Sequence, residues 1–260
     1  MLIKLLNPNY YFKTFKKIIS FICSPKNVLD KSYSFKENLV YVFSVWIITI
    51  ILFLLSEKLI NYLQVIRLIE PTVPHKPLGV LKGYPFIVFL SFSLIIGPLL
   101  EELVFRLSLK FNRLNLSISC GAITYFFSSP CLFNNKDVEI GINNIYRLLL
   151  GFTVFIVFYY LILNNSIERK LSNFWDRNFK YIFYFSVLSF GMIHITNYEL
   201  SLNHLLFIPI ITLPRIILGI IFGFIRTKFG IGWSIVLHVF YNGVLILPLI
   251  IIYINRYWLK

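Results

Sequence analysis

The sequence has 260 residues, of which 58% are hydrophobic and only 14% are charged. A soluble domain carries about 25% charged residues, so this chain has too little polar surface to cover a globule in water. Its apolar residues also fall in runs of roughly 17 to 25, the length that crosses about 30 Å of hydrocarbon. The composition therefore predicts an integral membrane protein and argues against a soluble domain.

The net charge is +14, and the Lys and Arg residues are scattered between the apolar runs. This distribution is typical of cytoplasmic loops in membrane proteins and not of a nucleic-acid-binding face, so no nucleic-acid partner is predicted. The three cysteines, Cys23, Cys120 and Cys131, form no close pair. Their spacing argues against a disulfide framework and against a structural zinc site.

Three parts follow one another along the chain. Residues 1–38 are basic and form a cytoplasmic or interfacial N-terminal segment, in which residues 8–22 mix lysines with aromatic residues and are compatible with an amphipathic helix at the membrane surface. Residues 39–83 hold a first membrane helix and a loop, and residues 84–260 hold the remaining membrane core.

The apolar runs predict seven membrane helices, at 39–55, 84–105, 114–133, 145–163, 179–195, 202–225 and 231–254. Pro209 and Pro214 interrupt the sixth run, and the count becomes eight if they divide it into two crossings. No run alternates as a barrel strand does, and helices satisfy their own backbone in lipid. The predicted fold class is an all-α, polytopic transmembrane bundle of seven or eight helices with a buried polar active site.

The loop charges predict the orientation of the bundle in a cell membrane. With a cytoplasmic N-terminus, the segments 106–113, 168–180 and 226–228 are also cytoplasmic, and each carries two or more Lys or Arg. The opposite loops, 134–144 and 196–201, are near neutral or acidic, as the positive-inside rule requires.

Ionisable residues inside apolar runs are costly and point to function. Glu101 and Glu102 follow sixteen largely apolar residues, and Glu102 shares a helix face with Arg106, four residues later. Glu101 is turned by about 100° from Glu102 and is left free to face a cavity, where burial near a like charge favours its use as a general base. The alternative is a helix end at the membrane interface with an ordinary ion pair.

Two further apolar runs carry polar side chains. His194 ends the fifth run, four residues after Phe190, and a core histidine bonded to a backbone carbonyl is the alternative to a functional one. His238 and Asn242 lie four apart in the seventh run, so both point to one side of a helix, with a structural interhelical bond as the alternative. Arg215, which follows Pro214, is assigned no chemistry.

The segments E-E-L-V-F-R, F-G-M-I-H and H-V-F-Y-N occur in this order, and the patterns GxSxG, HExxH, GxGD and paired-Cys zinc are absent. The three segments resemble the EExxxR, FxxxH and HxxxN motifs of the CAAX-protease and bacteriocin-processing (CPBP) family, also called Abi, which is related to the type II CAAX prenyl endopeptidases. The resemblance extends from about residue 85 to residue 244 and does not include residues 1–83.

One departure concerns the 93 residues between Glu101 and His194, which hold two additional predicted helices. Two crossings restore the direction of the chain, so the helices that carry Glu101 and His194 can still be antiparallel neighbours. In straight helices these residues would differ by roughly 15 Å in depth. A helix that restarts at Pro98 would bring Glu101 to mid-depth.

The resemblance implies an intramembrane endopeptidase that hydrolyses a peptide bond of a peptide or lipidated protein at the membrane lipid. It implies that Glu101, with His194, activates a water molecule and that His238 and Asn242 donate hydrogen bonds to the oxyanion. Glu102 then pairs with Arg106 and maintains the shape of the site, and Phe190 packs the helix that carries His194. A zinc ion bound by Glu101, His194 and His238 and a metal-free mechanism with Glu101 as base both remain open, as does the substrate.

Two other functions are compatible with the sequence. The chain could be a membrane scaffold or immunity-type protein whose polar residues only lock helices together, or a proton-coupled transporter with Glu101, His194 and His238 as a relay. The protease prediction requires Glu101, His194, His238 and Asn242 to converge on one site, whereas separate helix pairs would favour a scaffold.

Overall fold

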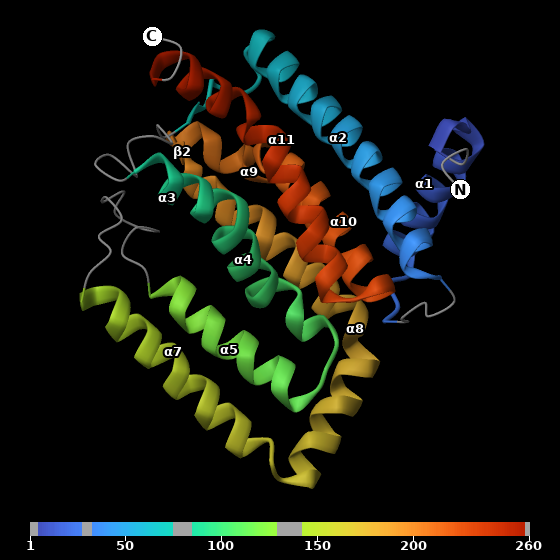
Figure 1. Cartoon of the computed structure of the whole chain (residues 1–260), viewed down its shortest axis with the longest axis vertical. Coiled ribbons are helices and arrows are strands. Elements are labelled where there is room, and N and C mark those ends of the chain that lie inside the picture. Colours follow the sequence, from blue (N-terminus) through green and yellow to red (C-terminus); the bar gives the residue numbers. More distant parts are fainter. Residues whose placement is uncertain (1–4, 28–32, 75–84, 129–141, 258–260) are drawn as a thin grey trace.

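The computed structural model describes residues 5–27, 33–74, 85–128 and 142–257 (Figure 1). In these ranges six helices or continuous helical runs are long and apolar enough to cross a membrane. The predicted all-α membrane bundle is therefore confirmed, and the protein is a multi-pass membrane protein. The bounds of the elements are as follows.

The helices are α1 (Pro8–Cys23), α2 (Phe35–Val65), α3 (Phe86–Ser91), α4 (Gly97–Phe105), α5 (Arg113–Phe127), α7 (Ile142–Leu161), α8 (Asn165–Ile193), α9 (Ile208–Ile211), α10 (Leu213–Phe229) and α11 (Ile231–Tyr257). A π-helical turn, Phe92–Ile96, joins α3 to α4, and 3-10 turns cover Leu107–Leu109, His194–Asn197 and Leu202–Phe207. Strand β1 (Val73–Pro74) pairs antiparallel with β2 (Tyr198–Glu199).

Several helices extend beyond the apolar runs that predicted them. Residues 168–180 and 226–228 were expected in loops but lie within α8 and α10. Hydropathy marks where a helix meets lipid, whereas the helix itself ends where its terminal groups find other partners. For α8 the start is set by Asn164, whose side chain accepts hydrogen bonds from the amides of Ser166 and Ile167.

Two predicted membrane helices differ in length from expectation. Helix α5 has 15 residues, and the expected end of this run, at 129–133, lies outside the described residues. The run at 202–225 is interrupted as its prolines predict, because Pro209 and Pro214 each stand in the first turn of a new helix, α9 and α10.

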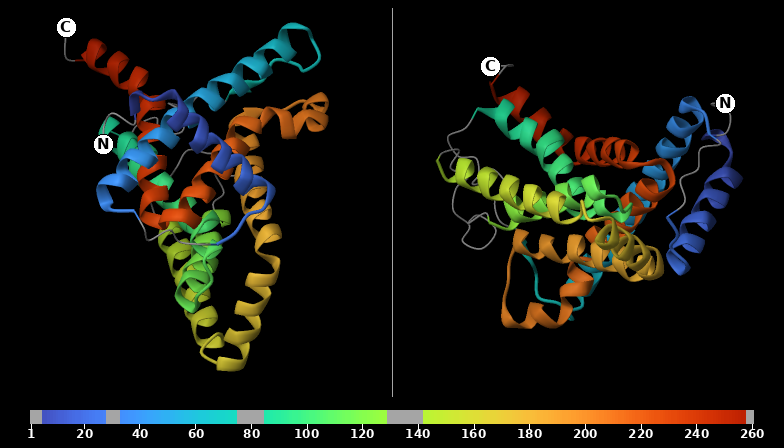
Figure 2. Two further views of the ribbon diagram at one scale, coloured as in Figure 1. Left: turned by 90° about the vertical axis from the view of Figure 1, so that its right-hand side faces the viewer. Right: turned by 90° about the horizontal axis from the view of Figure 1, so that it is seen from below.

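Helix α10 occupies the centre of the bundle and packs against α2, α8 and α11 (Figures 1 and 2). Helix α4 contacts α5, α8 and α11, and α1 packs across α2 and α10. Side chains from all these elements meet in one apolar core; its fully buried members include Ile18, Val45, Phe190, Phe222, Ile225 and Leu237.

Glycine permits the closest approach between α8 and α10. A Cβ atom on Gly191 would lie 2.4 Å from the Ile216 Cγ1 atom and 3.2 Å from the Ile216 backbone nitrogen. Small residues let membrane helices pack at short distance, since helix association in lipid depends on close contact. This contact fixes the end of α8, just before His194.

Helices α5 and α7 form a hairpin that contacts the rest of the bundle mainly through α4. The hairpin lies at the end of the molecule away from the C-terminal end of α11, as Figure 1 and the left view of Figure 2 show. Gly121 and Gly151 face each other, because a Cβ atom on either one would lie within 2.8 Å of the carbonyl oxygen of the other. Most apolar side chains of α7 remain exposed, as expected for a helix that faces lipid.

The segment after α2 is fastened to the turn before α9. The Glu70 carboxylate accepts hydrogen bonds from the Ser201 hydroxyl at 2.6 Å and from the Asn203 amide at 2.5 Å. The His204 ring is buried, and its Nε2 atom lies 3.0 Å from the Glu70 carbonyl oxygen. These contacts act together with the β1–β2 pair.

We expect Gly191→Ala to lower the stability of the protein, because the added methyl group overlaps Ile216. Overpacking of this kind costs about 1–3 kcal/mol. The matched control is Gly232→Ala in α11, where a Cβ atom would meet nothing within 4 Å. The melting temperatures of both variants in detergent test this expectation, and equal values for Gly191→Ala and Gly232→Ala would contradict it.

We also expect a pH-dependent contribution from Glu70. The hydrogen bonds from Ser201 and Asn203 lower the pKa of the Glu70 carboxyl below its usual value of 4.5. A lowered folded-state pKa stabilises the fold above the unfolded-state value, and this stabilisation is lost as the pH falls through the folded-state value. Melting curves between about pH 3 and 6 should therefore be less pH-dependent for Glu70→Gln than for the wild type; parallel curves would oppose this assignment.

Candidate active site

Two adjacent glutamates on α4 occupy different environments. A π-helical turn precedes α4, and Pro98 stands in its first turn, so the helix restarts at Gly97. The side chain of Glu101 keeps 22% of its surface exposed, whereas that of Glu102 is fully buried. One carboxylate is therefore accessible, and its neighbour is enclosed by protein.

The Glu102 carboxylate is surrounded by three polar partners. Its Oε1 atom lies 3.1 Å from His238 Nδ1 and 3.5 Å from Arg106 Nη1. Its Oε2 atom lies 2.6 Å from the Ser234 hydroxyl, which is also 2.9 Å from the Phe222 carbonyl oxygen, so the single hydroxyl hydrogen serves one of two acceptors at a time. A buried carboxylate requires such compensation. Both oxygens are thereby engaged with α4 and α11.

Arg106 neutralises this carboxylate from within a cluster of aromatic rings. Its guanidinium carbon lies 3.7 Å from the centre of the Phe190 ring and 5.6 Å from those of Phe105 and Phe222. Its side-chain nitrogens have no hydrogen-bond partner among the described residues. Cation–π attraction and the ion pair with Glu102 therefore compensate the buried charge.

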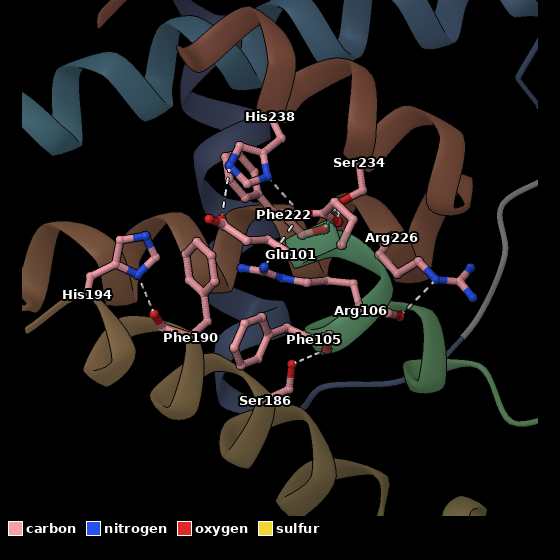
Figure 3. Close-up of polar contacts among 11 residues, drawn as sticks. Glu101, Phe105, Arg106, Ser186, Phe190, His194, Phe222, Arg226, Ser234 and His238 are labelled. Atoms are coloured by element: carbon pink, nitrogen blue, oxygen red, sulfur yellow. Dashed lines mark hydrogen bonds and ion pairs between the residues drawn. The ribbon is translucent and has the colours of Figure 1, made fainter. Parts of the chain in front are cut away.

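The His238 ring lies between the two carboxylates. Its Nδ1 atom faces Glu102, and its Nε2 atom lies 3.5 Å from Glu101 Oε2. Because a carboxylate only accepts, the Nδ1 atom carries a hydrogen, and Nε2 faces the accessible glutamate. The ring is 3% exposed and stacks on Phe222 with ring centres 4.4 Å apart. Figure 3 shows this arrangement from α11 down to α4.

His194 follows the last residue of α8, and its Nδ1 atom lies 2.7 Å from the Phe190 carbonyl oxygen. The carbonyl can only accept, so Nδ1 donates and Nε2 of the neutral ring is an acceptor. The Phe190 ring lies between His194 and the Arg106 guanidinium (Figure 3). The centre of the Phe190 ring is 4.7 Å from the centre of the His194 ring and 6.2 Å from that of the His238 ring. Phe190 thus links the two histidines.

Asn242 lies one turn after His238 on α11. Its side-chain amide donates to the Ser93 carbonyl oxygen at 3.0 Å, within the π-helical turn. The wide turn leaves backbone carbonyls without regular partners, which side chains can then bond. One of the two amide hydrogens of Asn242 is used in this contact, and the second remains for another acceptor.

Other residues, given no role by the sequence, support this site. Arg226 is buried and donates to the carbonyl oxygens of Arg106 and Leu107, at 3.1 and 3.0 Å, where α4 ends. The Ser186 hydroxyl donates to the Phe105 carbonyl oxygen. Ser234 precedes His238 by four residues, so the spacing that joins His238 to Asn242 also indicates Ser234. Nothing in the sequence indicates the backbone acceptors of Arg226.

The predicted site residues are therefore brought together in part. Glu101, Glu102 and His238 contact one another directly, together with Arg106. His194 joins them through Phe190 and interacts electrostatically with Glu101. Asn242 lies along the same helix as His238 and binds the backbone of the turn before α4.

The resemblance left open a zinc ion with Glu101, His194 and His238 as its ligands. In the described part of the chain no group of three or more His, Cys, Asp or Glu side chains is arranged to hold a metal ion. His238 Nε2 lies 3.5 Å from Glu101 Oε2, but His194 is related to this pair only through the Phe190 ring. In this structure Glu101, His194 and His238 therefore do not converge as a set of zinc ligands.

The family of type II CAAX prenyl endopeptidases, described as Rce1-like, matches residues 83–244, more than half of the 260 residues. Comparisons with curated proteins and with solved structures gave no match. The matched range contains all the predicted site residues and the π-helical turn.

We expect Arg106→Met to destabilise the protein strongly, since it leaves the Glu102 carboxylate buried without its cation. Breaking a buried pair costs about 3–5 kcal/mol. The double variant Arg106→Met, Glu102→Gln should recover part of this loss, because it removes both charges. A double-mutant cycle on unfolding in detergent measures the coupling, and additive effects would contradict a paired role.

Proposed function

The chain belongs to the type II CAAX prenyl endopeptidase Rce1-like family, and on that premise we propose that it hydrolyses a peptide bond of a membrane-associated substrate with Glu101 as the general base. One observation carries the proposal. The Oε2 atom of Glu101 has no hydrogen-bond partner among the described residues. It lies 3.5 Å from His238 Nε2, and the Glu101 side chain is partly exposed.

The two glutamates have different proposed roles. Glu102 has its oxygens engaged by His238, Ser234 and Arg106, so it orients His238 and does not exchange protons with substrate. The Glu101 side chain is partly exposed, and its Oε2 atom, which is itself buried, has no hydrogen-bond partner among the described residues. A general base must be within hydrogen-bond reach of the proton that it removes, and only Glu101 of this pair meets that condition.

The reaction begins when Glu101 takes a proton from a water molecule. The oxygen of the water attacks the scissile carbonyl carbon, and the carbonyl oxygen takes the negative charge. The proton then passes to the amide nitrogen, the carbon–nitrogen bond breaks, and a carboxylic acid and an amine leave. His238 Nε2 is the nearest group able to share the proton with Glu101 while it is held.

His194 and Asn242 complete the proposed site. His194 presents Nε2 as an acceptor, so it can hold the second hydrogen of the attacking water, as Glu101 holds the first. Asn242 keeps one amide hydrogen for the oxyanion, a contribution of about 3 kcal/mol in comparable sites. His238 faces two carboxylates, so we assign it to proton sharing and not, as the resemblance implied, to the oxyanion.

We expect Glu101→Gln to lower the rate of peptide cleavage by about 10²- to 10⁴-fold, the usual effect of losing a general base. The variant keeps the shape of the side chain and leaves the Glu102 contacts intact. Cleavage of a peptide bearing S-farnesylcysteine in proteoliposomes, followed by mass spectrometry, measures the effect.

The matched control is Glu168→Gln, since Glu168 pairs with Arg113 at 2.7 Å away from the site. It should cleave at the rate of the wild type. A folded Glu101→Gln protein that retains full activity would remove Glu101 from the mechanism.

A further inference from the structure

A basic pocket lies where the end of α1 meets the end of α10, and the proposed active site does not include it. Its volume is about 400 Å³, within the range of ligand pockets. No described carboxylate lines it, and its polar lining consists of lysines and hydroxyl-bearing side chains: Lys17, Lys26, Lys228, Ser20, Ser24 and Thr227. The pocket therefore presents positive charge and hydroxyl groups to whatever binds there.

The pocket lies at one end of the membrane-spanning helices. Helix α10 ends at Phe229 and α11 begins at Ile231, and both belong to apolar runs long enough to span a membrane. Lys228, in the last turn of α10, lies near the ring of Tyr33, two residues before the spanning helix α2 begins. Three spanning helices thus have an end beside the pocket. Such ends lie at the membrane surface, where the headgroups of phospholipids are located.

Two of the lysines approach the same aromatic ring. The Nζ atoms of Lys17 and Lys228 lie 6.0 and 5.4 Å from the centre of the Tyr41 ring. The dipole of α10 favours a cation at its C-terminal end and accounts for Lys228. It does not account for Lys17, which stands in the middle of α1. Like charges brought together repel each other, and an anion bound between them removes this repulsion.

The third lysine is positioned by the segment that follows α1. The Tyr184 hydroxyl donates to the Ile22 carbonyl oxygen. The Asn27 side chain donates to the Leu109 carbonyl oxygen at 3.2 Å. The chain is therefore held on both sides of Lys26, whose side chain lines the pocket. Residues distant in the sequence thus fix the place of this lysine.

Helix α1 also has the character of a helix that lies on lipid. Ile18 is buried in the bundle, whereas Phe12 and Ile19 are exposed among the lysines of the helix. Exposed apolar side chains beside lysines are typical of a helix in the plane of the membrane interface. Phe21 and Phe224 line the pocket, with ring centres 5.2 Å apart. A ligand here meets both cations and apolar surface, which suits a phospholipid better than a free anion.

We propose that this pocket binds the phosphate headgroup of an anionic phospholipid and that the bound lipid holds α1 against the bundle. The phosphate would accept hydrogen bonds from amines of α1, of the segment after it and of α10 at the same time. Basic pockets between membrane helices bind anionic headgroups in this way, and each lysine contributes about a fivefold gain in affinity. The inference does not depend on the proposed function of Glu101.

The test uses the full chain in a neutral detergent. Native mass spectrometry measures the binding of dioleoyl phosphatidylglycerol and of the neutral lipid dioleoyl phosphatidylcholine. We expect the wild type to bind the anionic lipid about 10- to 100-fold more tightly, and its melting temperature to rise only with that lipid. The triple variant Lys17→Gln, Lys26→Gln, Lys228→Gln should bind both lipids alike. The double variant Lys17→Gln, Lys26→Gln changes only exposed side chains, so it gives the same test if loss of Lys228 impairs folding.

The matched control is the triple variant Lys110→Gln, Lys170→Gln, Lys180→Gln, which removes the same charge from exposed lysines outside the pocket. It should keep the preference for the anionic lipid. Equal loss of preference in the two triple variants would overturn the assignment, because overall charge would then attract the lipid. A wild type that inorganic phosphate alone stabilises as much as the lipid does would also overturn it, since the pocket would then bind a free anion.

Discussion

The structure depends on a single buried carboxylate. Glu102 is enclosed by protein, and in lipid no water is present to solvate it, so Arg106, His238 and Ser234 must all be in place. These three partners come from α4 and α11, and the rings around Arg106 come from α4, α8 and α10. One charge thus requires four helices to meet at one depth, and their meeting creates the place where Glu101 stands.

The sequence predicted much of the membrane fold and part of the site. Periodicity was sufficient for residues on one helix, such as Glu102 with Arg106, because spacing alone defines a helix face. It could not decide which histidine meets Glu101, because that depends on how α8 and α11 pack around Phe190. The ends of several helices were not predicted, because the hydropathy of the sequence indicates only which residues lie in lipid. The ends of helices are set by capping residues such as Asn164.

Aromatic residues connect the charged centre to the rest of the protein. Phe190 contacts Arg106, His194 and His238, and Phe222 contacts Arg106 and His238. Rings can compensate a buried cation without supplying acceptors that would compete with Glu102. They also hold both imidazoles in fixed orientations, and a proton transfer over hydrogen-bond distance depends on such fixed orientations.

The π-helical turn Phe92–Ile96 has a consequence for chain length. It accommodates one residue more than an α-helical turn would, and Asn242 bonds to it through the Ser93 carbonyl. Loss of one residue here would restore regular winding and rotate α3 by about 100° relative to α4. The glutamates are anchored to α11, so the displaced part would be α3, whose Phe86 now stacks on Tyr253. The segment formed by α3 and the π-helical turn is therefore expected to tolerate substitutions more readily than deletions or insertions.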